Sequence, residues 1–223
     1  MAADQADLSK VVIGVLGGTG DQGRGLARRL ALAGHRIIIG SRDAERAGAA
    51  ADGLGGGPLL TGGLNQYAAE HSDVVIAAMP WDGHRDLLAA LAAPLAGKVL
   101  VDCVNPMGFD AKGAYALTVP EGSAAQQAAA VLPDSTVVGA FHHVSATLLL
   151  DPGVDRMDLD VLVLGDDRQA TDLVAAIADE IPGMRGVYGG RLRNCGQVEA
   201  LTANLVSINR RYKAHAGLRV TDI

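Results

Sequence analysis

The sequence predicts a doubly wound α/β fold, in which helices cover both faces of a mainly parallel sheet. Three observations predict it: short β-branched apolar runs alternate with segments of helical spacing, a glycine-rich turn follows the first run, and a looser strand-and-helix set follows near the C-terminus. Strands buried on both faces are apolar throughout, and parallel strands need crossover helices between them. At 223 residues, the chain is expected to form one large domain with a smaller C-terminal α/β extension.

The first elements form a β-α-β unit. The apolar run at 11–16 ends in glycines and predicts a strand. A helix is expected at 21–33, where apolar residues recur at helical spacing and Gly34 stands at a usual stop position. A second strand at 36–39 completes the unit.

The alternation continues along the chain. The further elements expected before His143 are a helix at 43–52, a glycine loop at 53–57, a weak strand at 59–60, a helix at 64–71, a strand at 73–78, a helix at 83–93, a strand at 98–101, a helix at 123–132 and a strand at 135–141. Beyond His143 the expected elements are a strand at 160–164, a helix at 168–181, a short strand near Val187 and a helix at 197–215. Strands separated by helices at these spacings predict a mainly parallel sheet.

The last expected helix carries an apolar stripe. Its members are Val198, Leu201, Leu205, Ile208 and Tyr212. Such a stripe packs against the core of its own chain or against a second subunit, and the sequence leaves both open.

Composition excludes several classes of partner. Acidic residues number 25 against 19 basic ones, and this net charge of -6 disfavours binding to nucleic acid. The first ten residues contain no apolar stretch, and the longest apolar run, at 87–97, is too short to cross a bilayer. Cys103 and Cys195 lie far apart and are expected to be reduced thiols. We therefore expect a cytoplasmic protein without a membrane partner.

A glycine motif joins the first strand to the first helix. It is formed by Gly18, Thr19, Gly20, Asp21, Gln22 and Gly23, which fit the G-x-G-x-x-G fingerprint of dinucleotide binding. Gly18 permits the tight turn, Gly20 lets a pyrophosphate approach the backbone, and Gly23 allows close packing of helix on sheet. The helix N-terminus offers N–H groups to the anion. The motif predicts a Rossmann-type nucleotide site.

The end of the second strand indicates which dinucleotide binds. NAD-binding proteins usually carry an acidic residue there, whereas this chain has Ser41 and Arg42, with Arg46 one helical turn later. Two hydrogen bonds to a charged group, each worth about 1.5 to 3 kcal/mol, would favour a 2′-phosphate by roughly a hundredfold or more. The cofactor is therefore expected to be NADP(H). The alternative is that Ser41 or Asp43 only caps a helix and both arginines are solvated.

Two further candidates follow predicted strands, where open α/β sheets bind ligands. His142 and His143 are expected to divide into one surface and one pocket-facing histidine, and no further ligands at suitable spacing suggest a metal site. Pro80 and Trp81 occupy an equivalent place after an earlier strand. The tryptophan either packs in the protein or contacts a bound ring.

Residues that other reductases require are missing. None of the four tyrosines has a lysine four residues later, which excludes the chemistry of short-chain reductases. The four lysines are Lys10, Lys98, Lys112 and Lys213, and none lies where hydroxyacid dehydrogenases carry their acid-base lysine. A nucleotide site with no evident acid, base or metal indicates a partner that needs only a hydride and correct positioning.

Five segments, taken together and in order, resemble the NADPH-dependent reductases of coenzyme F420, an 8-hydroxy-5-deazaflavin. The segments are Gly17-Gly18-Thr19-Gly20-Asp21-Gln22-Gly23, Gly40-Ser41-Arg42, Met79-Pro80-Trp81, Ala140-Phe141-His142-His143-Val144 and Glu199-Ala200-Leu201-Thr202. They lie within residues 11 to about 215 and so cover almost the whole chain. The chain departs from the family pattern at Asp21 and Ala200, where asparagine and serine are usual.

The resemblance implies a site for two coenzymes. For NADP(H), it assigns Thr19, Gly20, Asp21 and Gln22 to the pyrophosphate and nicotinamide, Ser41, Arg42 and Arg46 to the 2′-phosphate, and Met79, Pro80, Trp81 and Ala146 to the rest. For the deazaflavin, it assigns Asn105, His142, Val144 and Thr202. As a hypothesis, Thr19, His142 and Thr202 are the catalytic residues, which orient and polarise the two rings during hydride transfer.

The same resemblance implies how the chain is divided between the two coenzymes, and two alternative functions stay open. Residues 1–145 would form the NADP-binding domain, and 146–223 a smaller region that completes the deazaflavin site, with a homodimer expected. The acidic tail of F420 could be anchored by Arg191, Arg193 and the basic end of the last expected helix, or these groups could be solvated. The alternatives are a non-catalytic NADP-binding redox sensor and an NADP-dependent reductase of a small carbonyl or imine.

Overall fold

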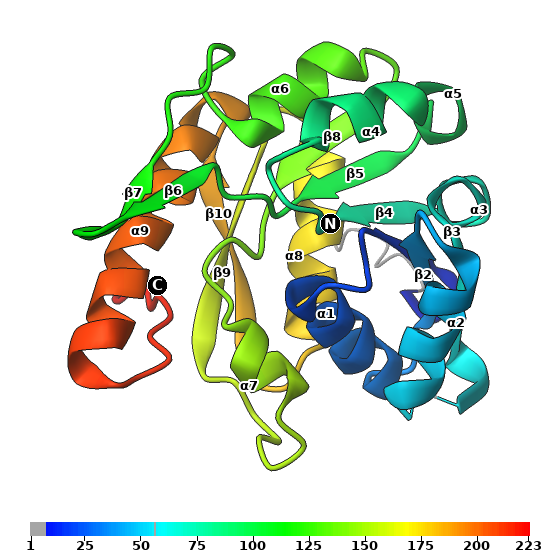
Figure 1. Cartoon of the computed structure of the whole chain (residues 1–223), viewed down its shortest axis with the longest axis horizontal. Helices are drawn as coiled ribbons and strands as arrows, with labels where there is room; N and C mark the ends of the chain where they lie inside the picture. The colour runs from blue at the N-terminus through cyan, green and yellow to red at the C-terminus, as the bar shows by residue number, and fades with distance from the viewer. Residues whose placement is uncertain (1–7, 56) are drawn as a thin grey trace.

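A computed structural model describes residues 8–55 and 57–223 of the chain (Figure 1). Within these residues, eight strands form one sheet in the order β10-β9-β8-β5-β4-β1-β2-β3. Its strands are β1 (Val12–Leu16), β2 (Arg36–Ser41), β3 (Leu60–Leu64), β4 (Val74–Ala77), β5 (Val99–Asp102), β8 (Thr136–Gly139), β9 (Leu159–Gly165) and β10 (Met184–Gly190). All neighbours pair in parallel except β8 and β9, which are antiparallel. The predicted doubly wound, mainly parallel fold is confirmed.

The helices lie on both faces of this sheet. They are α1 (Asp21–Leu32), α2 (Ala44–Gly53), α3 (Asn65–Glu70), α4 (His84–Ala90), α5 (Ala92–Leu95), α6 (Ala124–Val131), α7 (Ala146–Leu150), α8 (Arg168–Asp179) and α9 (Cys195–Tyr212). Short 3₁₀ turns occur at Leu8–Lys10, Gly57–Leu59 and Leu192–Asn194. One core lies between the sheet and α1, α2, α7 and α8, and the other between the sheet and α3, α4, α5, α6 and α9.

The central strands supply side chains to both cores, as their continuous apolar sequence predicts. In β1, Ile13 and Val15 point to one core, whereas Val12 and Leu16 point to the other. This follows from the two-residue period of a strand, because successive side chains leave on opposite faces. Every residue of β1 is buried.

Several elements differ from the sequence-based expectation. A hairpin of β6 (Met107–Asp110) and β7 (Gly113–Ala116) follows β5, and α7 follows the paired histidines; neither was predicted. The helix expected at 83–93 is interrupted at Leu91, and the last helix ends at Tyr212, because Lys213 takes a left-handed φ of 51°. Residues 1–7, at the start of the chain, and Gly56, in the expected loop at 53–57, lie outside the described residues.

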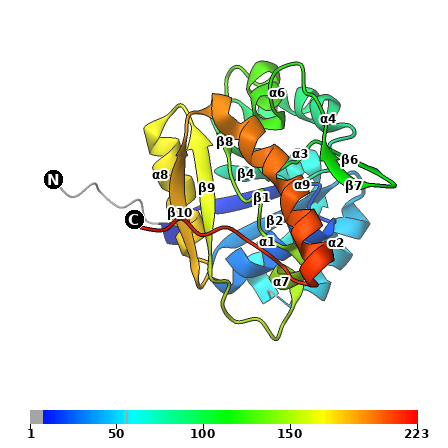
Figure 2. The ribbon, with the colours of Figure 1, turned by 90° about the vertical axis from the view of Figure 1, so that its left-hand side faces the viewer.

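The C-terminal segment covers an exposed sheet edge. β8 pairs only with the last two residues of β9, so the first part of β9 is left without a strand on that side. There the Asp160 N–H donates to the Leu218 carbonyl at 2.8 Å, and the Asp160 carboxylate accepts from the Val220 N–H at 2.6 Å. Figure 2 shows this tail running back beside β9 and β10. Covering an unpaired edge prevents pairing with other chains.

The stripe on α9 divides between two environments. Val198 and Leu205 are buried, whereas Leu201, Ile208 and Tyr212 are exposed. The helix packs along β7 of the hairpin (Figures 1 and 2). Part of the stripe therefore belongs to the core of the chain, and the rest remains available at the surface.

Candidate active site

The predicted site residues gather at the carboxyl ends of the parallel strands. From β1 the chain passes through α1 to β2 and β3 on one side of β1, and it then crosses to β4 on the other side. The turn after β1 therefore stands at the switch point of the sheet, where the strand order reverses. The turn contacts its neighbours directly: the Gly18 N–H donates to the Gly40 carbonyl at 2.9 Å, and the Ala78 N–H donates to the Leu16 carbonyl at 3.0 Å.

Two glycines of the motif are required by the packing of the turn. A Cβ on Gly18 would lie 2.7 Å from the Val15 carbonyl oxygen, and one on Gly23 would lie 2.7 Å from Gly18 Cα. Both distances are too short for real contacts, so these glycines serve the fold.

Gly20 differs from them. It has φ -78° and ψ 164°, which any residue adopts, and the nearest described atom to an added Cβ is the Gly17 carbonyl oxygen at 3.7 Å. The fold therefore has no need of glycine at this position. An open backbone here suits the close approach of a phosphate.

The N-terminus of α1 carries no side-chain cap. Among the described helices of eight or more residues, α2, α6 and α8 are capped by Asp43, Ser123 and Asp167, whereas neither Gly20 of α1 nor Asn194 of α9 provides a side-chain cap. The first N–H groups of a helix have no partner within the helix, and they attract anions. The residues around Gly20 therefore fit a dinucleotide pyrophosphate.

The residues after β2 combine a local cap with two exposed arginines. Ser41 is buried and its Oγ accepts from the Asp43 N–H at 3.2 Å, while Asp43 accepts from the N–H groups of Glu45 and Arg46 and caps α2. Arg42 and Arg46 are exposed, and neither forms an ion pair with a described residue. The helix cap and the two exposed guanidinium groups are thus both present.

The turn after β4 packs on the glycine turn. A Cβ on Gly17 would lie 2.8 Å from Met79 Cα. The Met79 side chain is buried. Pro80 is exposed, and the half-buried Trp81 ring is tilted against the His84 ring with centroids 5.5 Å apart. Trp81 therefore packs in the protein on one side and reaches the surface on the other.

The segment after β8 joins α1, the turn after β5 and α9 through its backbone carbonyls. The Phe141 carbonyl accepts from Gln22 Nε2 at 3.3 Å, and the His142 carbonyl accepts from Asn105 Nδ2 at 3.0 Å and from Thr202 Oγ1 at 3.4 Å. Phe141 is buried with φ 62°, a region that bulky residues rarely adopt. Such strain occurs most often at functional sites, where surrounding contacts enforce it.

Both histidines are buried, so the expectation of one surface histidine is wrong. The His143 ring donates from Nε2 to the Val198 carbonyl of α9 at 2.6 Å, and burial lowers its pKa. The two ring nitrogens of His142 find no partner among the described residues, and burial lowers the pKa of this ring to about 4. A sequence shows that two histidines are adjacent, but it does not show that α9 folds over both. His142 is uncharged at neutral pH.

Val144 and Ala146 lie where α7 begins. Val144 is buried, and the half-exposed Ala146 is the first residue of α7. The buried guanidinium of Arg29 on α1 donates to four carbonyls of the residues that end and follow α7, at 2.5 to 3.1 Å. Gly25 lets α1 approach, because a Cβ there would lie 2.5 Å from Leu149 Cβ. Arg29 was not predicted from the sequence, because its partners lie about 120 residues away.

Two further residues missed from the sequence support the site. Asn65, at the start of α3, accepts the Gly17 N–H on its Oδ1 at 3.1 Å. The buried carboxylate of Glu199 accepts from the N–H groups of Ala124 and Ala125 at 2.8 and 3.2 Å, and burial raises its pKa to about 7. Glu199 therefore ties α9 to the N-terminus of α6. An asparagine at the start of a helix is a signal that can be read in the sequence, whereas Glu199 was noted only as part of the family resemblance.

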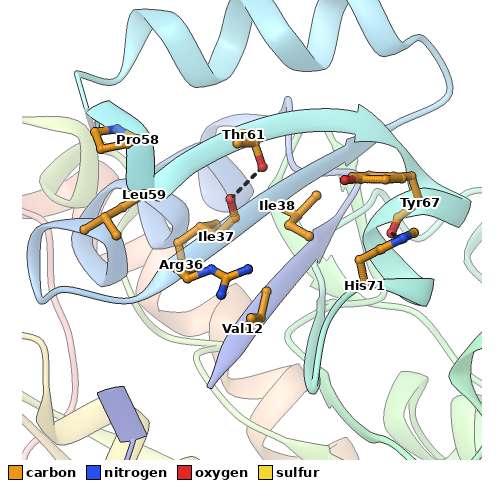
Figure 3. A pocket seen from close by; sticks show the side chains of 9 residues that line it. All are labelled: Val12, Arg36, Ile37, Ile38, Pro58, Leu59, Thr61, Tyr67 and His71. Atoms are coloured by element: carbon orange, nitrogen blue, oxygen red, sulfur yellow. Dashed lines mark hydrogen bonds between the residues drawn. The ribbon is translucent and has the colours of Figure 1, made fainter. Parts of the chain in front are cut away.

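A cavity of about 310 Å³ lies elsewhere (Figure 3). Val12 and Arg36, the first residues of β1 and β2, line it with Tyr67 and His71, which stack at 4.2 Å between ring centroids. The turns that follow β1 and β2 stand at the opposite ends of these strands. No group of three or more metal-ligating side chains, and no helix long and apolar enough to cross a membrane, occurs among the described residues.

Comparison with known proteins identifies the family. A family model described as NADP oxidoreductase, coenzyme F420-dependent, matches residues 12–106. The F420-dependent NADP reductase of Methanothermobacter marburgensis is 39% identical over 225 residues, covering 95% of this chain and 98% of the relative. The enzyme of that name from Methanocaldococcus jannaschii is 37% identical over 221 residues, covering 95% and 98%. The chain belongs to the F420-dependent NADP reductases.

A solved structure agrees with this family. A crystal structure from an Arthrobacter species, described as a candidate F420-dependent NADP reductase, has a TM-score of 0.82 and 27% identity, covering 95% of this chain and 100% of that one. As an F420-dependent NADP reductase, the chain is an oxidoreductase whose two substrates are NADP(H) and F420. The predicted family, activity and coenzymes are confirmed. The sensor and the carbonyl or imine reductase are not favoured.

Proposed function

We propose that hydride transfer takes place at the carboxyl edge of the sheet, with the nicotinamide and deazaflavin rings stacked in front of the turns after β1, β4, β5 and β8. When both coenzymes are bound, the C4–H bond of NADPH breaks, the hydride bonds to C5 of the deazaflavin, and N1 of that ring takes a proton from solvent. The observation that carries the proposal is the open, uncapped N-terminus of α1 at Gly20, at the switch point of the sheet.

The NADP(H) half of the site would use mostly backbone. The N–H groups after Gly20 would bind the pyrophosphate, with Asp21 and Gln22 beside it. Ser41, Arg42 and Arg46 would bind the 2′-phosphate, for which the two exposed guanidinium groups, without an ion pair in the described part of the chain, are the support. Met79, Pro80, Trp81 and Ala146 would contact the rest of the dinucleotide.

The deazaflavin half would lie between the turn after β5 and α9. Asn105 and Thr202 both donate a hydrogen bond to the His142 carbonyl. These three residues form one connected surface, which we call the deazaflavin wall, and Val144 lies beside it. Thr19 and Thr202 offer hydroxyl groups, and His142 offers an uncharged ring. We propose that these three residues orient and polarise the rings without donating a proton, because the low pKa of His142 leaves it uncharged. Holding the reacting carbons about 3 to 3.5 Å apart can lower the barrier by about 7 to 11 kcal/mol.

We also propose that two parts of the chain serve different coenzymes. Residues 1–145 would bind NADP(H), and residues 146–223 would complete the deazaflavin site, for which the bond from Thr202 on α9 to His142 is the support. Arg191 and Arg193, both exposed, are candidates for the acidic tail of F420. The unpaired cysteines, Cys103 and Cys195, support a cytoplasmic location.

A homodimer is the proposed assembly. Large apolar side chains are exposed on α9 and on the adjacent hairpin: Leu201, Ile208, Tyr212, Phe109 and Tyr115. Exposed apolar groups on neighbouring elements are typical of subunit interfaces. Light scattering after size exclusion should give a mass of two chains for the native protein and one chain for Ile208→Glu. A single-chain mass for the native protein would refute the dimer.

Spectroscopy tests the proposed reaction site. The purified protein, mixed with NADPH and oxidised F420, should remove the visible absorbance of the deazaflavin. The double variant Asn105→Ala/Thr202→Val should retain its affinity for NADPH and lose affinity for F420. Unchanged KM for F420 in that variant would show that the deazaflavin binds elsewhere.

A further inference from the structure

A fully buried pair of a histidine and a carboxyl group lies close in sequence to the proposed deazaflavin wall. His84, the first residue of α4, and Asp102, the last residue of β5, are both completely shielded from solvent. His84 Nε2 lies 2.7 Å from Asp102 Oδ2. Burying such a pair is costly unless every remaining hydrogen-bonding atom is satisfied. The other atoms of both side chains are therefore informative.

The partners of the His84 ring determine its protonation. Nδ1 lies 3.1 Å from Gln127 Oε1, so each ring nitrogen faces an oxygen acceptor. The amide of Gln127 cannot be reversed, because its Nε2 donates to a carboxylate oxygen of Glu121 at 3.3 Å, and that carboxylate also pairs with Arg85 at 2.5 Å. When Asp102 carries no proton, both ring nitrogens of His84 must donate, which only the imidazolium does.

Asp102 connects this ring to the coenzyme site. Its Oδ2 accepts from His84, and its Oδ1 accepts from the Val104 N–H at 2.9 Å. The next residue is Asn105, whose side-chain amide donates to the His142 carbonyl at 3.0 Å. The orientation of the carboxylate therefore sets the backbone that carries Asn105.

We propose that His84 is a positioning residue for hydride transfer: as an imidazolium it holds the Asp102 carboxylate in the orientation that fixes Val104 and Asn105 against the deazaflavin. This inference rests on the proposed placement of the deazaflavin beside Asn105. His84 does not touch either coenzyme in this arrangement. It acts through Asp102.

The surroundings of the ring support the charged form. Burial opposes it, but the bonds to Asp102 and Gln127, together with the negative charges of Asp102 on β5 and Glu199 on α9, raise the pKa of His84 above its ordinary value. Trp81, before α4, contributes an uncharged ring, and Glu121 acts through Gln127. The pKa of His142, which also faces Asp102, is low because that ring is buried without a bond.

Nitrogen NMR of the full chain tests the protonation directly. In protein labelled at histidine, both ring nitrogens of His84 should carry a proton at pH 7.5. The His84 signals are assigned by their absence in His84→Gln. If that variant does not fold, Gln127→Met provides the assignment, because loss of the Gln127 acceptor should shift only the His84 titration to lower pH. A neutral His84 ring at pH 7.5 would overturn the proposal.

Kinetics test the positioning role. As pH rises through the His84 titration seen by NMR, KM for F420 should increase by about tenfold or more, while KM for NADPH changes little. In Gln127→Met, the rise in KM for F420 should move to lower pH by the same interval as the NMR titration. His71→Gln, which removes a histidine far from the site, should leave both profiles unchanged.

The outcomes separate this inference from the proposed site. If Asn105→Ala leaves KM for F420 unchanged, the proposed placement of the deazaflavin fails even where NMR finds the imidazolium. If Asn105→Ala raises KM for F420 but the titration of His84 does not, the site stands and the positioning role is overturned. A rise in KM for F420 that moves with the His84 titration in both proteins supports the role.

Discussion

The two halves of the proposed site are built in different ways. In the NADP(H) half, the pyrophosphate site consists of a turn and a helix N-terminus that lie within a few residues of each other, and its principal groups are backbone N–H donors. The deazaflavin half brings together Asn105, His142 and Thr202 through hydrogen bonds that span 37 and 60 residues. A locally built half tolerates change elsewhere in the chain, whereas a half built from distant segments depends on every contact that holds those segments.

The largest expected effect separates two glycines in the local half. Gly20→Ala should fold normally, because an added Cβ has room, but NADPH affinity should fall by about a hundredfold when that Cβ meets the pyrophosphate. Gly23→Ala should lose both thermal stability and binding, because its Cβ would lie 2.7 Å from Gly18 Cα. Calorimetric binding and thermal melts measure the two quantities. Normal NADPH affinity in Gly20→Ala would show that the phosphates bind elsewhere.

The two exposed arginines should affect only one form of the nucleotide. Arg42→Gln/Arg46→Gln removes two charge-assisted partners, and affinity for NADPH should fall by roughly a hundredfold. Affinity for NADH, which has no 2′-phosphate, should change by less than about twofold. Arg168→Gln, at an exposed arginine on α8, serves as the control. Equal losses for both nucleotides would contradict a 2′-phosphate site at these arginines.

The distant half should respond to pH through Glu199. Burial raises its pKa to about 7, so its contribution to the free energy of unfolding is complete below its ordinary pKa of 4.5 and is lost as pH rises toward 7. The expected loss is on the order of 2 to 3 kcal/mol. Glu199→Gln, which keeps one acceptor for the N–H groups of α6, should remove this part of the pH dependence. Thermal melts from pH 4.5 to 8 that are identical for both proteins would refute it.

A smaller effect is expected from a single hydroxyl group. Thr202→Val keeps the shape of the side chain and removes the bond to the His142 carbonyl, so single-turnover hydride transfer should slow by about tenfold. Ser207→Ala is the matched control, because that hydroxyl also bonds to a carbonyl but within α9 itself. Equal rates in the native protein and Thr202→Val would mean that the carbonyl keeps its position without the threonine.

Parts of the molecule with a strong local signal were predicted well from the sequence. The order of strands and helices through β5 follows from apolar runs and helical periodicity, and the glycine motif was predicted at its correct place between β1 and α1. The hairpin of β6 and β7 was missed because its strands have four residues each and are partly exposed. The short helix α7 was missed because it depends on Arg29 of α1, not on its own five residues.

The sequence by itself determined the sheet-and-helix alternation, the glycine turn and the basic residues after β2, because each of these is set by neighbours within a few positions. Only the tertiary structure decided that both His142 and His143 are buried, that Phe141 takes a left-handed conformation, and which members of the α9 stripe join the core. It also decided which acceptors surround the His84 ring, and the proposed charge of that ring depends on them. Those acceptors, on β5 and α6, come from residues 18 and 43 positions away.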